Sequence, residues 1–358
     1  MGEATMKPGE DRNKPEVGVL QEPVFLVGLG PHGEVPASIG HLDVSDHVAQ
    51  QARARHFRVA VVLHTTKSDW ASQQVKGIAE TLEQYGASVA TIVDCDFRAS
   101  RQIDELRALI PMRPDAIISI PVDNMLTAGA HREIGQAGIK LVLMDNAPAG
   151  LHPGTDYVTV VSSDSLGNGQ VAAEILSQHV PEGGAIGIVS FGFNFFVTNE
   201  REIGFRKWLS EHRPDATFRR VQFIELSAVG GLAMDFLARY PQLDALFVVW
   251  DEPAMHIVRA LRSAGRRIPM ATIALGNEVA IEVAKGDLVK GVGAQRPYDL
   301  GVAEALATIL SLTGHEPPPW IALPALAVTR SNLVHAYESV WRMSVPAAVR
   351  EALEAGWA

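Results

Sequence analysis

The sequence predicts an α/β fold of two doubly wound parallel-sheet lobes joined by a three-crossing hinge. From Phe57 onward, short apolar runs rich in Val, Ile and Leu alternate with segments of helical period, as is typical of a parallel sheet covered on both faces. This alternation runs through two successive series of five candidate strands. The chain has 358 residues, 47% of them hydrophobic, which is enough to bury two separate cores.

The first series of strands begins at Phe57. FRVAVVLH at 57–64 predicts a buried strand, and Val75, Ile78 and Leu82 then recur at helical spacing before Gly86 ends the segment. Further strands of this series are expected at 88–93, 115–120, 140–145 and 157–161, with helices at about 100–110 and 125–137. The second series is expected to form strands at 185–191, 219–226, 245–250, 270–275 and 289–294, with helices near 201–212, 231–240, 254–264 and 279–285.

The two series imply two lobes between which the chain crosses three times. The crossings are expected near 161–164, 294–297 and 325–330. An N-terminal lobe should then comprise 57–161 plus 296–326, and a C-terminal lobe 162–295 plus 327–358, with terminal helices in SNLVHAYESVW and PAAVREALEAGW. Residues 1–56 do not show this alternation of strands and helices and are interpreted as an N-terminal extension. Within it, the segment 21–36 predicts a strand and turn, and 45–55 predicts a lead-in helix.

Composition and charge argue against several classes of function. The formal net charge of −10 repels a phosphate backbone, and no cluster of Lys or Arg interrupts it, so nucleic acid is not an expected partner. Cys95 is the single cysteine, which excludes an intrachain disulfide and a cysteine-based zinc site. His64, His131 and His152 do not pair with other ligands at metal-binding spacing, and no metal is expected. The first sixteen residues contain no apolar run of a secretory signal, and no later run reaches the roughly 18 apolar residues of a membrane span.

Gly28, Gly30 and Gly33 spell the GxGxxG motif of dinucleotide-binding enzymes. That motif must open a helix whose N-terminus faces the pyrophosphate. Here Pro31 lies inside the turn, Pro36 follows, and no amphipathic segment begins. The motif therefore predicts a tight turn, and neither an enzyme nor a bound cofactor is expected.

Polar and aromatic side chains follow the predicted strands at their carboxyl ends, which is where open α/β sheets bind ligands. Planar carboxylates and amides can bond two neighbouring hydroxyls, and tryptophan faces can cover the C–H surface of a sugar. Each residue also has a purely structural alternative: Asp123, Asp145 or Asn277 could cap a helix, and Trp70 or Trp250 could be a core residue. The joint placement of so many such groups favours a binding site for a sugar or sugar alcohol.

Seven segments between Phe57 and about Thr329 occur in a specific order and spacing: VAVVLHTTKSDWASQQVKGI, PDAIISIPVD, GIKLVLMDN, VSSDSLGNGQVAAE, TNEREIGF, LFVVWDEPAMHIVRALRSAG and GVGAQRP. In these segments the sequence resembles the periplasmic sugar-binding proteins of the ribose-binding type. These are solute-binding proteins of ABC transporters with the type 1 periplasmic binding fold, and their lobes also occur in sugar-responsive repressors.

The resemblance implies a set of ligand-binding residues. Trp70 takes the place of the stacking aromatic, Asp145 that of the aspartate that bonds ring hydroxyls, and Gln295 that of the late glutamine. Asn146 and Asn199 stand where ribose binders have arginines, so the site should have little to neutralise an acidic sugar. Lys67 and Asp69 lie in the same loop as Trp70, and Asp123 follows the third strand. Trp250 replaces a polar residue of the family, and Asn277 replaces an aspartate.

The resemblance also implies a function. The protein is expected to bind a small neutral sugar or sugar alcohol between its lobes and to deliver it to the permease of an ABC importer. It would do so as a monomer, in the periplasm or another extracytoplasmic compartment. An intact transcription regulator needs a helix-turn-helix ahead of residue 57, where Pro23, Pro31 and Pro36 oppose one. The alternative is therefore the ligand-sensing lobe of a sugar-responsive transcription regulator that lacks its DNA-binding part.

Overall fold

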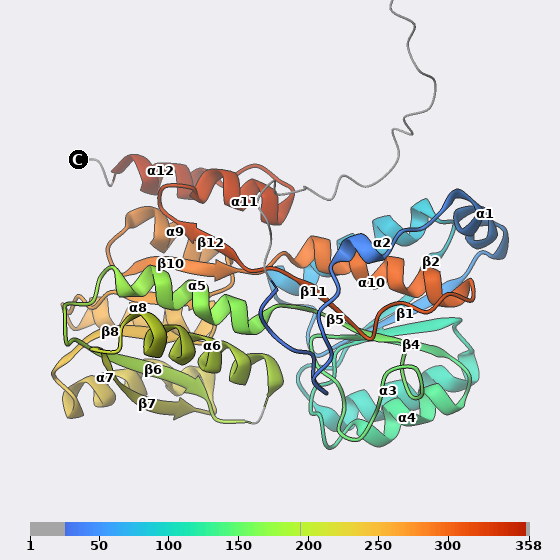
Figure 1. Ribbon diagram of the computed structural model, residues 1–358, viewed down its shortest axis with the longest axis horizontal. Helices are drawn as coiled ribbons and strands as arrows, with labels where there is room; N and C mark the ends of the chain where they lie inside the picture. The colour runs from blue at the N-terminus through green and yellow to red at the C-terminus, as the bar shows by residue number, and fades with distance from the viewer. Residues whose placement is uncertain (1–25, 194, 356–358) are drawn as a thin grey trace, which may run out of the picture.

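The computed structural model describes residues 26–193 and 195–355 of the chain, which form two α/β lobes side by side (Figure 1). The sheet of the N-terminal lobe has the order β11-β5-β4-β3-β1-β2 with every pair parallel. Its strands are β1 (Arg58–Leu63), β2 (Ser88–Asp94), β3 (Ala116–Ser119), β4 (Lys140–Met144), β5 (Thr159–Ser163) and β11 (Trp320–Leu323). The helices of this lobe are α1 (Asp46–Arg55), α2 (Asp69–Gln84), α3 (Ala99–Met112), α4 (Ala128–Gln136) and α10 (Pro297–Leu312).

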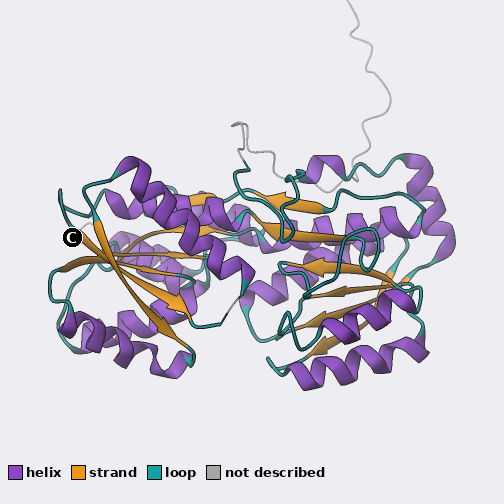
Figure 2. Ribbon diagram, turned by 60° about the horizontal axis from the view of Figure 1, so that its bottom comes forward, coloured by secondary structure: helices purple, strands orange, loops and turns teal. Residues whose placement is uncertain are grey.

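The C-terminal lobe repeats this architecture with the order β12-β10-β9-β8-β6-β7, and only β12 runs antiparallel to its neighbour. Its strands are β6 (Ala185–Phe191), β7 (Thr217–Phe223), β8 (Leu243–Val248), β9 (Met270–Ile273), β10 (Val289–Ala294) and β12 (Leu326–Thr329). Its helices are α5 (Ser165–Ser177), α6 (Phe196–His212), α7 (Val229–Arg239), α8 (Asp251–Ser263), α9 (Asn277–Lys285), α11 (Leu333–Trp341) and α12 (Ala347–Ala355). In each lobe, helices cover both faces of the sheet (Figure 2).

Burial on both faces explains why the strands read as unbroken apolar runs. In β1, Val59, Val61 and Leu63 face one core of the N-terminal lobe, while Ala60 and Val62 face the other. Every one of these five side chains is fully buried. A strand with two dry faces has no position for an alternating polar residue. The predicted fold of two doubly wound parallel-sheet lobes is therefore confirmed.

The chain crosses between the lobes three times, as predicted. It leaves the first sheet after Ser163, returns after Ala294 and leaves again after Leu323. Each sheet, however, has six strands and not the expected five. The sixth strand of each comes from the last crossing, where β11 and β12 are only four residues long and follow a proline-rich loop.

Two buried helices, α5 and α10, were not predicted because they lack a polar face. Almost every side chain of α10 is buried, so its sequence has no amphipathic period. In α5, glycines allow an unusually close approach to α6. A Cβ at Gly169 would overlap the carbonyl oxygen of Arg201. The glycines that obscure the helix in the sequence are thus the residues that let it pack.

The described part of the N-terminal extension packs on the N-terminal lobe. The expected lead-in helix is confirmed as α1, which buries Val48, Ala49 and Ala52 in the core of that lobe. The strand expected within 21–36 is not found in its described part, 26–36, which is a loop and turn; residues 21–25 lie outside the described residues. The nearest strand-like contact is a single bridge between Ala37 and Ile321.

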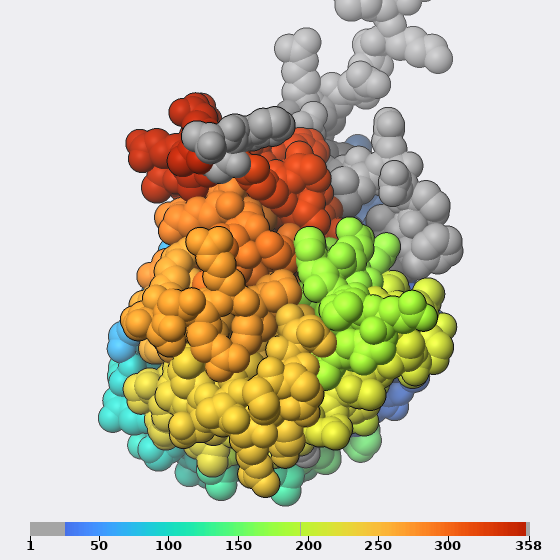
Figure 3. All heavy atoms as spheres, turned by 90° about the vertical axis from the view of Figure 1, so that its left-hand side faces the viewer, coloured from blue at the N-terminus to red at the C-terminus, as the bar shows by residue number. Residues whose placement is uncertain are grey.

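Helices α11 and α12 lie on the C-terminal lobe over α9, in red above the orange segment in Figure 3. The indole N–H of Trp341 donates to the carbonyl of Leu275 at 2.8 Å, which ties α11 to this lobe. The side-chain amide of Gln73, on α2 of the other lobe, donates to the carbonyl of Trp341 at 2.6 Å. Through the whole described range, none of the helices combines the length and apolar character that a membrane span needs.

Candidate functional site

The carboxyl ends of both sheets meet where the chain crosses between the lobes. The polypeptide leaves β5 at its carboxyl end to enter the C-terminal lobe, and it leaves β10 at its carboxyl end to return. All strands except β12 are parallel, so the loops after β1, β4, β6, β8 and β10 face the junction between the lobes. Those loops carry most of the predicted residues.

Asp145 and Asn146, directly after β4, form the N-terminal lobe's part of a buried polar cluster. Asp145 is 5% exposed and has the left-handed backbone angle φ of 59°, a conformation that costs free energy for a residue other than glycine. Its Oδ1 has no hydrogen-bond partner among the described residues, and neither has either side-chain atom of the fully buried Asn146. The helix-cap alternative for Asp145 is therefore not what the structure shows.

The C-terminal lobe brings Arg201 to the same cluster. Its guanidinium is buried and donates to the carbonyl of Val249 at 3.2 Å, while its Nε has no partner in the described part of the chain. Burial lowers the pKa of Arg201 to about 10, although the carboxylates of Asp145 and Asp251 act to raise it. Burial likewise raises the pKa of Asp145 to about 6, against the opposing effect of Arg201. The charges of Arg201 and Asp145, which come from different lobes, thus act on each other.

Arg201 supplies a buried cation that the expectation of little to neutralise an acidic sugar did not include. Thr198, Arg201, Glu202 and Phe205 share the buried face of α6, whereas Asn199 in the first turn is only half-buried. Side chains two positions apart on a helix point in nearly opposite directions. The arginine that reaches the buried carboxylates is therefore two positions after Asn199 in the segment TNEREIGF.

Further buried polar groups come from the crossings themselves. Gln295, directly after β10, is 5% exposed, and its amide donates to the hydroxyl of Ser163 at 3.3 Å. Asn168, in the first turns of α5, is fully buried, and neither side-chain atom has a partner among the described residues. Sequence reasoning missed Asn168 because the helix that carries it was not recognised. Its position inside the matching segment VSSDSLGNGQVAAE was the available signal.

Each lobe has a predicted tryptophan near the carboxyl end of one of its strands. In the N-terminal lobe, Trp70 packs edge-on against His64 with ring centroids 5.9 Å apart, and burial lowers the pKa of His64 to about 4, so this ring is neutral at pH 7. In the C-terminal lobe, Trp250 contacts Phe191 at 5.3 Å and Phe223 at 5.1 Å. Both tryptophans are half-buried. Each lobe therefore has a half-buried tryptophan at the ligand-binding edge of its sheet, and such rings suit the C–H surface of a polyhydroxylated molecule.

Asp69 and Asn277 contact each other across the lobes. The amide of Asn277, at the start of α9, donates to Oδ2 of Asp69, at the start of α2, at 2.6 Å. The same amide's oxygen accepts from the hydroxyl of Tyr337 on α11 at 2.5 Å. Both Asp69 and Asn277 are exposed, so they form a latch at the rim of the cluster and not part of its buried centre.

We expect Asn277→Ala to loosen the contact between the lobes and to weaken ligand binding two- to tenfold. The substitution removes a hydrogen bond to a charged group at a solvent-exposed position, where such bonds contribute modestly. Tyr337→Phe is the matched control, because it leaves the bond between the lobes in place. Calorimetry and solution scattering would measure the affinity and the radius of gyration; equal values for both variants and the wild type would contradict the latch.

Two predicted residues lie outside the cluster. The ammonium of Lys67 pairs with Asp96 at 2.6 Å, and its side chain is 71% exposed. Oδ1 of Asp123 accepts from the backbone N–H groups of Met125 and Leu126 at 2.8 and 2.7 Å, so this carboxylate is occupied in capping a turn. For Asp123 the structural alternative is the one that the geometry supports.

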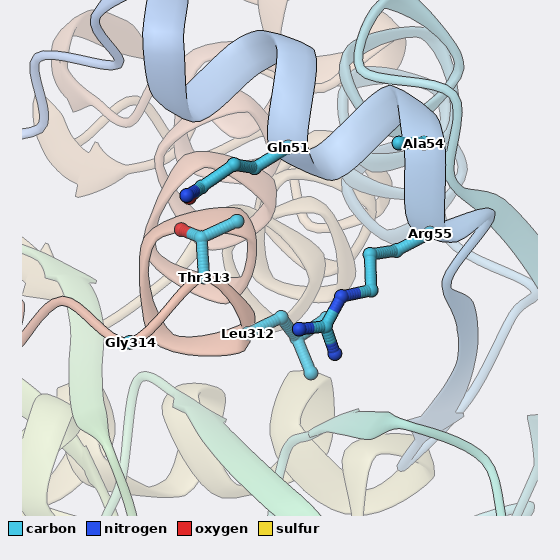
Figure 4. A pocket seen from close by; sticks show the side chains of 6 residues that line it. All are labelled: Gln51, Ala54, Arg55, Leu312, Thr313 and Gly314. Carbon is cyan, nitrogen blue, oxygen red and sulfur yellow. The ribbon is translucent and has the colours of Figure 1, made fainter.

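The surface hollow between α1 and α10 is a weaker candidate for a ligand-binding site. Figure 4 shows a surface hollow of about 440 Å³ between α1 and the end of α10, lined by Gln51, Ala54, Arg55, Leu312, Thr313 and Gly314. None of these six residues has a buried polar atom without a partner. Across the described residues, no three side chains of His, Cys, Asp or Glu are grouped so that they could hold a metal ion.

Comparison with known proteins identifies the family. Residues 59–315 match the periplasmic binding protein domain family, which is well over half of the chain. The chain belongs to this family. The ribose import binding protein of Bacillus subtilis is a relative that is 23% identical over 248 residues, which cover 69% of this chain and 79% of that protein. The D-ribose/D-allose-binding protein of Pseudomonas aeruginosa is 24% identical over 234 residues, which cover 63% of this chain and 72% of that protein.

Solved structures of periplasmic binding proteins share the fold. An ABC transporter solute-binding protein from Agrobacterium vitis, bound with α-D-tagatopyranose, superimposes with a TM-score of 0.72 at 22% identity, covering 81% of this chain and 99% of that chain. Another from the same organism, with bound allitol, has a TM-score of 0.67 at 18% identity, covering 79% of this chain and 98% of that chain. The family consists of substrate-binding proteins and not of enzymes.

Proposed function

We propose that this protein binds a small neutral sugar or sugar alcohol between its two lobes and delivers it to the permease of an ABC importer. The observation that carries the proposal is the set of buried polar atoms without partners, contributed by both lobes at the crossing: Oδ1 of Asp145, Nε of Arg201, and both amide atoms of Asn146 and of Asn168. Burying such atoms is costly unless a ligand's hydroxyls bond them.

The charge balance of the cluster favours a neutral ligand. Arg201 supplies one positive charge against the carboxylates of Asp145 and Asp251, both of which are mostly ionised above pH 6 because their pKa values are about 6. An acidic sugar would add a further negative charge to a site in which one guanidinium already faces the charge of two carboxylates. The neutral preference therefore follows from this balance of charges and not from the absence of arginine.

The relatives and fold neighbours support the same assignment. Two of the relatives are named for ribose or allose, and two of the fold neighbours were solved with a ketose or a sugar alcohol. We infer that this chain acts as a monomeric binding protein in the periplasm or another extracytoplasmic compartment, without a cofactor and without catalysis. The sensing lobe of a transcription regulator without its DNA-binding part is not favoured, since these relatives and fold neighbours are named as import or transporter binding proteins.

A ligand panel tests the proposal directly. Thermal shift and calorimetry with D-tagatose, allitol, D-ribose, D-allose and a uronic acid should show stabilisation by a neutral member and none by the acid. A ligand at 100 times its Kd adds about 2.7 kcal/mol to the free energy of unfolding. Tight binding of the acid with no response to any neutral member would overturn the proposal.

We expect Trp70→Ala to weaken binding of the neutral ligand by about 1 to 3 kcal/mol, because it removes the aromatic surface of the N-terminal lobe. Trp208→Ala is the control, since Trp208 stacks on His212 at 4.4 Å on α6, away from the cluster. Calorimetry on both variants separates loss of ligand contact from a general effect of removing an indole. Wild-type affinity for Trp70→Ala would remove this residue from the site.

A further inference from the structure

Residues 26–37, which include the GxGxxG motif, lie across the hinge. In Figure 1 this dark blue segment runs through the region where the strands pass between the lobes. It precedes the match to the periplasmic binding protein domain, which begins at residue 59. The function described above gives these residues no role.

One end of this segment contacts the C-terminal lobe. The backbone N–H of Val27 donates to Oδ2 of Asp164 at 2.7 Å. The other oxygen of Asp164 accepts from the backbone N–H of Gly167 at 2.9 Å and so caps α5, the helix that carries Asn168. Asp164 also donates its own N–H to the carbonyl of Leu323 at 2.7 Å. The segment therefore bonds the residue at which the first crossing enters the C-terminal lobe.

The other end is attached to the N-terminal lobe. Ala37 donates to the carbonyl of Trp320 at 3.1 Å and accepts from the N–H of Ala322 at 2.9 Å, which makes it a short parallel addition to β11. Trp320 is 1% exposed, and its indole donates to the hydroxyl of Ser162 on β5 at 2.8 Å. One segment thus holds strand β11 of one lobe and the helix cap of the other.

The glycines of the motif are required by this close approach. A Cβ at Gly28 would lie 2.7 Å from Oδ1 of Asp164 and 3.5 Å from both Leu166 and Trp320. A Cβ at Gly30 would lie 3.0 Å from the Trp320 ring, and Gly33 has a φ of 87° in the turn that follows. The GxGxxG spacing therefore reflects the close packing of this segment against the hinge and its turn at Gly33, and not a phosphate-binding loop.

We propose that residues 26–37 are a strap that positions Asp164 and the start of α5, and that it favours the arrangement in which the two lobes touch. The strap contacts both lobes in the arrangement that also contains the bond between Asp69 and Asn277. A contact shifts a conformational equilibrium only by its preference for one state. Loosening the strap should therefore open the hinge. The strap's effect on ligand affinity rests on the proposed function.

The test uses two variants of the full-length protein that release the strap by different means. Val27→Pro removes the N–H that bonds Asp164, and Gly28→Val introduces the Cβ that collides with it. Val35→Ser is the matched control on the same segment, because Val35 is 78% exposed. Circular dichroism establishes that each variant is folded. Should one variant fail to fold, the other decides.

Measurements on the ligand-free protein test whether residues 26–37 act as a strap. Both variants should show at least tenfold faster amide exchange at Gly167 and a larger radius of gyration by solution scattering, while Val35→Ser matches the wild type. Unchanged exchange and an unchanged radius in a folded variant would overturn the proposal. With D-tagatose or allitol, calorimetry should show about tenfold weaker binding for both variants. If the wild type binds no neutral ligand, the proposed function fails, whereas the ligand-free results still decide the strap.

Discussion

Arg201→Met is expected to abolish tight ligand binding, with a loss of affinity of at least 100-fold at pH 8. The variant removes a buried guanidinium that interacts with the charge of Asp145 and leaves that carboxylate buried without it. Removing one of two interacting buried charges costs about 3 to 5 kcal/mol, because the remaining charge keeps its desolvation penalty. The free energy of unfolding should fall by a similar amount at pH 8 and by less at pH 5, where the carboxylates take up protons.

Arg206→Met provides the comparison on the same helix. The Arg206 side chain is about half exposed and pairs with Glu202 at 3.6 Å, so its loss should cost less than about 1 kcal/mol and leave affinity unchanged. Chemical denaturation and calorimetry on the two variants would measure both effects. A second change, Asp145→Asn, should restore part of the stability lost in Arg201→Met. Full affinity in a folded Arg201→Met would exclude this residue from the site.

Ligand affinity should depend on pH through Asp145, with binding about tenfold weaker at pH 5 than at pH 8. The pKa of this buried carboxyl is about 6, so roughly one molecule in ten carries the ionised form at pH 5. A ligand hydroxyl donates best to the ionised carboxylate. Binding should therefore release protons near pH 6. The Asp145→Asn variant should bind more weakly at pH 8 and show no pH dependence across this range.

Stability should vary in the opposite direction. The folded pKa of Asp145 lies above its ordinary value, so the folded protein holds the proton more tightly than the unfolded chain. The contribution of Asp145 to the free energy of unfolding is therefore present below about pH 4 and declines by about 3 kcal/mol as the pH rises to 6. Glu304, a fully buried neighbour, has its pKa raised well above its usual value, chiefly by burial and also by Asp145.

Asp251→Asn separates the two carboxyls with similar pKa values. Oδ2 of Asp251 accepts from the backbone N–H of Gly276 at 3.0 Å, which gives this carboxylate a structural partner in its own lobe. We expect its variant to keep the pH dependence of binding and to lose only part of the pH dependence of stability. Calorimetric titrations at pH 5, 6, 7 and 8 would measure both. A binding profile that flattens in Asp251→Asn and persists in Asp145→Asn would transfer the role to Asp251.

The sequence by itself determined the two-lobed fold and located about half of the residues of the candidate site. Strands buried on both faces, such as β1, show their character in a continuous apolar run, and the residue that ends a parallel strand lies at the ligand-binding edge wherever the sheet packs. Asp145, Asn146 and Gln295 could therefore be located from strand ends alone, and Trp70 and Trp250 with them. The strands β11 and β12 could not, because they lie in a proline-rich stretch with Pro324 between them, and prolines are typical of loops and turns.

Only the tertiary structure decided which polar side chains meet. Whether Asn199 or Arg201 faces the buried carboxylates depends on where α6 begins, and that boundary lies five residues before the expected one. Whether Asp69 and Asn277 face a ligand or each other depends on how the lobes approach, which no local pattern encodes. The glycines of the strap and of α5 show the same limit. A sequence records that a glycine leaves space, whereas the packing of distant segments determines what occupies it.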